Sequence, residues 1–152
     1  MAISTSITHI SPIYKYYFLY FEAPMALVGT ALILVNPTRF LNGTLPYNTL
    51  VTHPLPLTPP VKMLLTNIAF LYAMIFVLEG IVLRASREKV VWKGILGAML
   101  VSDVGHLWSL WEVDATRMGM LRAWTGDEWF NYGTLWAGTV LRVAFMCGLG
   151  WR

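Results

Sequence analysis

Four long apolar stretches alternate with shorter polar segments along this chain. They cover residues 15–36, 61–83, 90–111 and 129–151. Each is long enough to cross the hydrocarbon core of a bilayer as a helix, which takes about 20 residues. The pattern predicts an all-α fold, an integral membrane four-helix bundle, in which residues 1–152 form a single transmembrane domain.

The polar segments predict three different connections. The first two apolar stretches are separated by a proline-rich loop that includes Pro46, Pro54, Pro56, Pro59 and Pro60. Because proline cannot continue a helix, we expect an extended chain there. Arg84 to Lys89 form a charged turn between the second and third stretches. Residues 112–128, polar with a few large apolar side chains, are typical of an interfacial helix.

The composition agrees with a membrane protein. Of the 152 residues, 57% are hydrophobic and 12% are charged, whereas roughly 25% are charged in an average soluble domain. This balance excludes a disordered chain and argues against a soluble globular domain.

Cysteine content and charge exclude further classes of function. Cys147 is the one cysteine, so neither an intrachain disulfide nor a Cys-based metal site can form, and we expect a small buried hydrophobe there. The scattered carboxylates show no metal-ligand spacing, so we expect no metal. The net charge of +3 comes without a basic cluster interleaved with aromatic residues. We therefore expect no nucleic-acid partner.

An even number of spans places both termini on one side of the membrane. The ends and loops on that side carry six lysines and arginines, against four on the other side. Because positive charge is enriched on the cytoplasmic side, we expect both termini in the cytoplasm. Tryptophans and tyrosines near the span ends, among them Tyr17, Trp92 and Trp124, are expected in the interfacial aromatic belts.

Each predicted span contains an ionisable residue. A charged side chain in hydrocarbon costs roughly 2.5 to 3.5 kcal/mol even on insertion scales, so such residues indicate a functional site. The candidate catalytic residues are Glu22, Glu79, Asp103, His106 and Arg142.

Helix geometry predicts where these groups lie. Counted along each helix from the cytoplasmic side, Glu22 and Glu79 are about 6 to 10 Å deep, Arg142 about 14 Å, and Asp103 and His106 about 20 to 27 Å. The side chains are thus expected in two layers with Arg142 between them. Asp103 and His106 are three residues apart and share a helix face, so we expect them to form the core of the catalytic pair.

Four other side chains in the spans are expected to contact a substrate. Residues seven or eleven apart on a helix share a face, which aligns Tyr72 with Glu79 and Asn131 with Arg142. The expected substrate-binding residues are Asn67, Tyr72, Asn131 and Trp108.

Structural explanations compete with each of these assignments. Glu79 can pair with Arg84, and Glu22 with Lys15, at the cytoplasmic edge. Arg142 can simply neutralise a carboxylate and lock the bundle. Asp103 and His106 can form a buried hydrogen-bonded pair, and the amides of the spans can hold helices together.

Carboxyl groups at different distances from Arg142 differ in how firmly they hold a proton, so we expect one neutral acid and one ionised base. An acid that protonates an epoxide oxygen and a base that activates water or a hydroxyl suit ring opening or cyclisation. The same pair suits isomerisation of a double bond.

The apolar surroundings indicate a lipophilic substrate that arrives from the bilayer. The chain contains no phosphate-binding loop, nucleophile elbow or dinucleotide fingerprint, so we expect no cofactor.

Several motifs resemble a family of small four-span fungal membrane proteins, most of them known only as a domain of unknown function. The motifs occupy residues 18–24, 67–84, 103–107 and 141–145, including Asp103-Val104-Gly105-His106-Leu107. The resemblance covers nearly the whole chain. Some members are similar to the small epoxide-opening enzymes of fungal polyketide pathways of the citreoviridin and aurovertin type. The resemblance implies catalytic roles for Glu22, Glu79, Asp103, His106 and Arg142.

The expected protein is an integral membrane enzyme of the endoplasmic reticulum, an epoxide hydrolase or cyclase of secondary metabolism. Its partners would be a lipophilic small molecule and membrane lipids, and the sequence leaves a homo-oligomer open. One alternative is a sterol or terpenoid isomerase or cyclase, which would place aromatic rings around Asp103. The other is a non-catalytic lipid-binding or scaffolding protein, in which the polar side chains would saturate one another.

Overall fold

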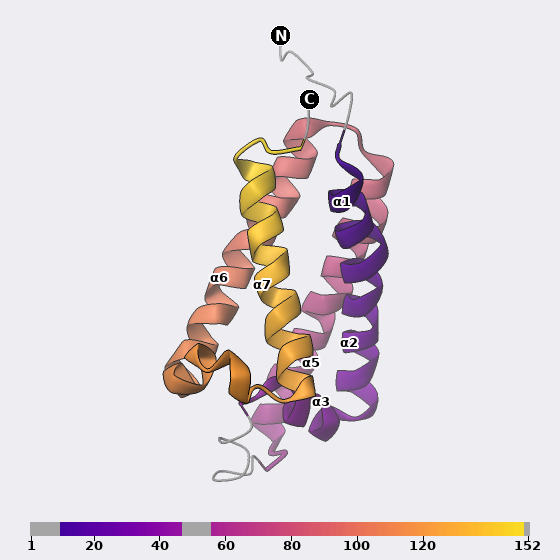
Figure 1. Ribbon diagram of the computed structural model, residues 1–152. Coiled ribbons are helices and arrows are strands. Elements are labelled where there is room, and N and C mark those ends of the chain that lie inside the picture. The colour runs from indigo at the N-terminus through magenta and orange to yellow at the C-terminus, as the bar shows by residue number, and fades with distance from the viewer. Residues whose placement is uncertain (1–9, 47–55, 151–152) are drawn as a thin grey trace.

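The computed structural model describes residues 10–46 and 56–150, and every element in those residues is a helix (Figure 1). The all-α prediction is therefore confirmed for the described residues. The end of the fourth predicted span, at residue 151, and much of the proline-rich loop lie outside them.

Four long helical passes run side by side and alternate in direction (Figure 1). The first joins α1 (Pro12–Tyr14), the π-helix η1 (Lys15–Glu22) and α2 (Ala23–Val35). The second joins α5 (Pro59–Ile75) and the π-helix η2 (Phe76–Leu83). The third is α6 (Lys89–Gly119), and the fourth is α7 (Gly126–Met146). Two short helices lie in the connections, α3 (Pro37–Thr44) and the 3₁₀-helix η3 (Leu121–Ala123).

Three of these passes are long and apolar enough to cross a membrane, namely Pro12–Val35, Pro59–Leu83 and Lys89–Gly119. The chain thus has the character of an integral membrane protein. The fourth pass, α7, is not one of the three. It includes Asn131, Arg142 and several glycines and threonines, which lower its apolar character.

Two connections differ from the prediction. The segment after the first pass is helical over Pro37–Thr44 rather than extended, because Pro37 begins the helix and the Asn36 side chain accepts a hydrogen bond from the Arg39 N–H at 3.0 Å. In the segment 112–128, α6 itself continues to Gly119. It bends at Asp114, whose φ is −155° and whose carboxylate accepts from the Arg117 N–H at 2.9 Å, so that it caps the last turns.

Two tryptophans expected at the membrane interface are instead buried. Trp92 is 1% exposed and Trp124 is 8% exposed. The indole N–H of Trp92 donates to the Ser86 carbonyl at 2.9 Å, and that of Trp124 donates to the Arg117 carbonyl at 3.0 Å. A buried indole is tolerated because its single donor is satisfied. Cys147, expected to be buried, is exposed at the end of α7.

The passes associate as two pairs. Helix α2 packs against α5, and α6 packs against α7. At one end η1 and η2 contact each other and join the pairs through an apolar cluster that contains Phe18, Leu83, Trp92 and Phe145. At the other end α3 contacts both α2 and α7. The space between the two pairs is where the candidate site lies.

The N-terminus of α7 carries a capping box, because the Thr125 side chain accepts from the Glu128 N–H while the Glu128 carboxylate accepts from the Thr125 N–H at 2.7 Å. We predict that Thr125→Ala lowers the free energy of unfolding by about 1 kcal/mol. The measurement is SDS-induced unfolding followed by circular dichroism. Thr66→Ala is the matched control, since Thr66 is exposed and, within residues 10–46 and 56–150, bonds only the Lys62 carbonyl of its own helix. Equal losses in both variants would show that the cap contributes nothing.

Candidate functional site

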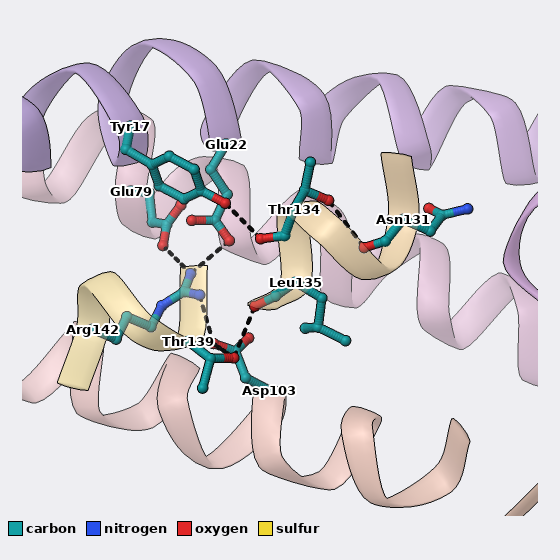
Figure 2. Close-up of polar contacts among 9 residues, drawn as sticks. All are labelled: Tyr17, Glu22, Glu79, Asp103, Asn131, Thr134, Leu135, Thr139 and Arg142. Atoms are coloured by element: carbon teal, nitrogen blue, oxygen red, sulfur yellow. Dashed lines mark hydrogen bonds and ion pairs between the residues drawn. The ribbon is translucent and has the colours of Figure 1, made fainter. Parts of the chain in front are cut away.

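Arg142 lies at the centre of the bundle and binds three carboxylates (Figure 2). Its Nη1 donates to Asp103 Oδ2 at 2.7 Å. Its Nη2 donates to Glu22 Oε1 at 2.6 Å and to Glu79 Oε1 at 2.9 Å. The four residues come from η1, η2, α6 and α7, so one guanidinium joins all four helical passes.

The site is deeply buried. Arg142 is 1% exposed and Glu79 is fully buried, whereas the side chains of Asp103 and Glu22 are 10% and 24% exposed. Three ionised carboxylates beside one guanidinium would leave a formal charge of −2. In an apolar surrounding such a charge is costly. A neutral cluster holds two protons among its three carboxyl groups.

Some polar atoms of this cluster have no hydrogen-bond partner among the described residues. They are Glu22 Oε2, Glu79 Oε2 and Arg142 Nε. A buried polar group without a partner costs free energy. A protonated carboxyl, a water molecule or a ligand atom would relieve this cost at Glu22, because its side chain is partly exposed.

Two π-helical segments carry the glutamates. Glu22 is the last residue of η1, and Glu79 lies inside η2. Such wide turns are rare and concentrate at functional sites. At the end of η1, Pro24 has no N–H to donate to the Leu19 carbonyl five residues earlier, and the Arg84 guanidinium donates to that oxygen at 3.5 Å.

Neighbouring side chains hold the guanidinium in place. The Thr139 hydroxyl lies 3.4 Å from Asp103 Oδ2 and 2.8 Å from the Leu135 carbonyl (Figure 2). The Phe18 ring lies 5.1 Å from the Arg142 guanidinium carbon, a cation–π contact. Gly138 makes room for the guanidinium, because a Cβ at that position would lie 2.7 Å from Arg142 Nη1.

A cavity of about 360 Å³ opens beside this cluster. Glu22, Asp103 and His106 line it, whereas Glu79 and Arg142 lie behind its wall. The three carboxylates therefore divide into two that a ligand can reach and one, Glu79, that is sealed in the protein.

The prediction of two layers is wrong for Asp103, which joins Glu22 and Glu79 in one cluster around Arg142. The depths were counted from the cytoplasmic end of each predicted helix, which assumes that these ends lie at one level, and the observed contacts show that they do not. The alternative pairs Glu79–Arg84 and Glu22–Lys15 do not form among the described residues, since both glutamates bind Arg142.

Asp103 and His106 both face the cavity, as their spacing predicts. In the described structure the Asp103 carboxylate accepts from Arg142 and Thr139, and not from His106. The arginine, which carries a full charge, occupies the position expected for the imidazole. His106 is thus a separate polar group on the cavity wall.

Two of the four predicted substrate-binding residues line the cavity, and two do not. Tyr72 and Asn131 line the cavity, and the Tyr72 ring occupies the space that a Cβ on Gly29 would need. Asn67 and Trp108 do not line it, and Trp108 is 65% exposed. On an α-helix Asn67 lies about 140° around the axis from Tyr72, and Trp108 about 160° from His106, so neither can share the cavity face.

Tyr17 is a cavity residue that the sequence did not predict. Its hydroxyl donates to the Thr134 carbonyl at 2.6 Å, and its ring lies beside Glu22 and Glu79 (Figure 2). A straight α-helix would place Tyr17 about 140° from Glu22, so its aromatic character suggested only an interfacial belt. The one signal in the sequence that points to altered helical phase here is Pro24.

The far end of the cavity is bounded by α3 and the first turns of α7. The Arg39 guanidinium donates to both oxygens of Asp127, at 2.9 and 3.1 Å. The Asn131 amide donates to the Gly43 carbonyl, and the Tyr132 hydroxyl to the Thr44 carbonyl at 3.3 Å. The hydrogen bonds with Arg39 hold the pKa of Asp127 below its ordinary value, and those with Asp127 raise the pKa of Arg39.

Comparison with known protein families identifies one family model that matches this chain. A family model described as "Domain of unknown function (DUF7704)" matches residues 7–152. Neither the curated proteins nor the solved structures contain a match. Within the described residues no group of three or more His, Cys, Asp or Glu side chains is arranged to hold a metal ion.

Removal of the central cation should destabilise the bundle strongly. We predict that Arg142→Gln costs about 3 to 5 kcal/mol in unfolding free energy, because it leaves buried carboxyl groups without their donor. SDS-induced unfolding measures this loss. The control is Arg122→Gln, at an exposed arginine of η3, where we expect a change within about 0.5 kcal/mol. Similar losses in the two variants would contradict the central role of Arg142.

The ion pair at the far end should be visible in a titration. A carboxylate with a lowered pKa stabilises the fold fully above its ordinary pKa, and this contribution disappears as the pH falls through the lowered value. We predict that Arg39→Gln returns the pKa of Asp127 toward about 3.9. Carbon NMR of labelled aspartate carboxyls measures the shift. Arg87→Gln, at an exposed arginine at the opposite end of the bundle, should leave it unchanged. A pKa of Asp127 that does not respond to Arg39→Gln would exclude the pair in solution.

Proposed function

The chain belongs to the DUF7704 family, a domain of unknown function, and for it we propose a membrane-embedded enzyme that opens an epoxide in a lipophilic, polyketide-type substrate by general acid/base catalysis. One observation carries the proposal. Two carboxyl groups, Glu22 and Asp103, face one cavity and are held by the same guanidinium.

The charge of the cluster supports an acid and a base side by side. With two protons on three carboxyl groups, at least one of Glu22 and Asp103 is neutral. When Glu79 holds the second proton, one cavity carboxyl is a neutral acid and the other is an ionised base. Glu79, sealed behind the wall, and Arg142 act as positioning residues, because they hold the two cavity carboxyls and set their charge.

The proposed step moves two protons. One of Glu22 and Asp103 donates a proton to the epoxide oxygen as a carbon–oxygen bond of the ring breaks. The other accepts a proton from water, or from a hydroxyl of the substrate, as that oxygen forms the new bond to carbon. Water yields a diol and an internal hydroxyl yields an oxygen heterocycle. His106, Tyr72 and Asn131, which line the same cavity, would orient the attacking oxygen or the substrate.

The surroundings support a lipophilic substrate and a membrane location. Most of the cavity wall is apolar, and the helices around it expose many large apolar side chains to the outside, where lipid would contact them. The Ser11 N–H donates to the Gly150 carbonyl at 2.8 Å, so the described ends of the chain lie together. In the proposed topology of four spans, both ends are cytoplasmic and the membrane is that of the endoplasmic reticulum.

A second candidate is a sterol or terpenoid isomerase or cyclase. Aromatic rings in the cavity wall support this candidate, because such rings stabilise carbocations. The rings are those of Tyr17, Phe21, Phe40, Tyr72 and Phe130. A non-catalytic lipid-binding role draws support from Glu79 alone, because that carboxylate is paired and sealed, whereas Glu22 and Asp103 reach the cavity.

Turnover of a lipophilic epoxide by microsomes that contain the protein tests the proposal. We predict that Asp103→Asn lowers kcat by at least about 100-fold, because the amide still accepts from Arg142 but cannot exchange the proton. Glu112→Gln, at an exposed residue of α6, is the matched control and should retain full activity. Mass spectrometry of the product in heavy-oxygen water distinguishes diol from heterocycle. Undiminished turnover in Asp103→Asn would remove Asp103 from the mechanism.

A further inference from the structure

The cavity has a second polar end, away from the carboxyl groups of the proposed reaction. Arg39 and Asp127 line it together with Asn131, and the Arg39–Asp127 pair is about half exposed, at 54% and 48% of the side chains. In Figure 1 α3 lies beside the lower end of α7. Arg142 is near the opposite end of that helix, whose last residue is Met146. Thr139, which contacts Asp103, follows Asp127 by 12 residues, or about 18 Å along the helix.

The wall between the two polar ends is mainly apolar. Met25, Leu32, Phe40 and Ile75 contribute to it from α2, α3 and α5. A ligand that fills this space must therefore be apolar over most of its length, since a polar group in the middle would lose its water without gaining a partner.

The far end suits a polar group without net charge. Arg39 and Asp127 neutralise each other, so the pair offers neither an anion nor a cation a net attraction. Their mutual bonds leave part of the guanidinium donors and of the carboxylate lone pairs available, and both side chains are accessible. Such a pair presents a donor and an acceptor at one place, which a hydroxyl, an ester or an amide can match.

We infer that the cavity binds an elongated ligand with two polar ends: an uncharged head group at Arg39, Asp127 and Asn131, an apolar body, and a terminal oxygen at Glu22 and Asp103. The inference rests on the proposed function in that it concerns the same cavity, and it names the substrate class. The pair of Arg39 and Asp127 then determines which lipophilic molecules the cavity accepts, and it fixes the distance between the head group and the reacting oxygen.

The test uses binding rather than turnover. The full chain in phosphatidylcholine nanodiscs is titrated with two probes of equal length, dodecanol and dodecanediol, and with diols from octane to hexadecane. Affinity is measured by thermal shift and corrected for partition of each probe into protein-free nanodiscs. We expect dodecanediol to bind about tenfold more tightly than dodecanol, because its second hydroxyl gains a charge-assisted hydrogen bond. Affinity among the diols should pass through a maximum as the length matches the cavity.

Variants assign the effect to the far end of the cavity. In Asp127→Asn and Arg39→Gln the tenfold preference for the diol should fall to about one, while dodecanol binds as before and circular dichroism shows intact helices. Glu112→Gln, the matched control outside the cavity, should keep the preference. Ala26 lines the cavity, so Ala26→Phe should place a large side chain in it and abolish binding of both probes.

Three results would overturn the inference. They are equal affinity for the two probes, a diol preference that survives both variants, and tight binding of a phospholipid that neither probe displaces. Because no step of this test involves an epoxide, absence of turnover in the microsomal assay would refute the proposed reaction and would leave the binding result standing.

Discussion

The structure depends on one guanidinium with more carboxylates than it can neutralise. Arg142 binds Glu22, Glu79 and Asp103, and each of the four helical passes contributes one member of the cluster. In a low-dielectric surrounding, no member can be removed without leaving charge or hydrogen-bonding capacity unmet. The relative position of the passes follows from this constraint, and apolar contacts such as those of Phe18 and Phe145 pack around it.

The same cluster supplies the carboxyl groups on which the proposed chemistry rests. A purely structural cation would be matched by one carboxylate, whereas Arg142 holds three, of which two reach the cavity. If the cluster is neutral, two of the three carboxyl groups hold protons, and the proposed acid and base rest on this distribution. Glu79, fully buried behind the wall, is needed to hold the guanidinium rather than to touch a ligand. In the proposed function, the stability of the bundle and the reactivity of the site both follow from this charge imbalance.

The backbone bends to bring these side chains together. Both glutamates lie on π-helical turns, and the first of these precedes Pro24. A regular α-helix would have turned Tyr17 well away from Glu22, and the side chain now lies beside the cluster (Figure 2). Hydrophobic periodicity assumes regular turns, which is why it identified the spans and the ionisable residues but missed Tyr17 and the Arg142–Asp103 contact.

Composition and pattern by themselves determined that the chain is helical, that it is apolar enough for a membrane, and that a few ionisable residues lie inside the helices. These properties are local, because they follow from the free energy of placing each residue in water or in hydrocarbon. Which groups meet was decided only by the tertiary structure. Asp103 binds Arg142 instead of His106, Trp92 is buried, and α3 bounds one end of the cavity. Contacts between helices depend on their stagger, and the local pattern of one helix contains no information about the start of another.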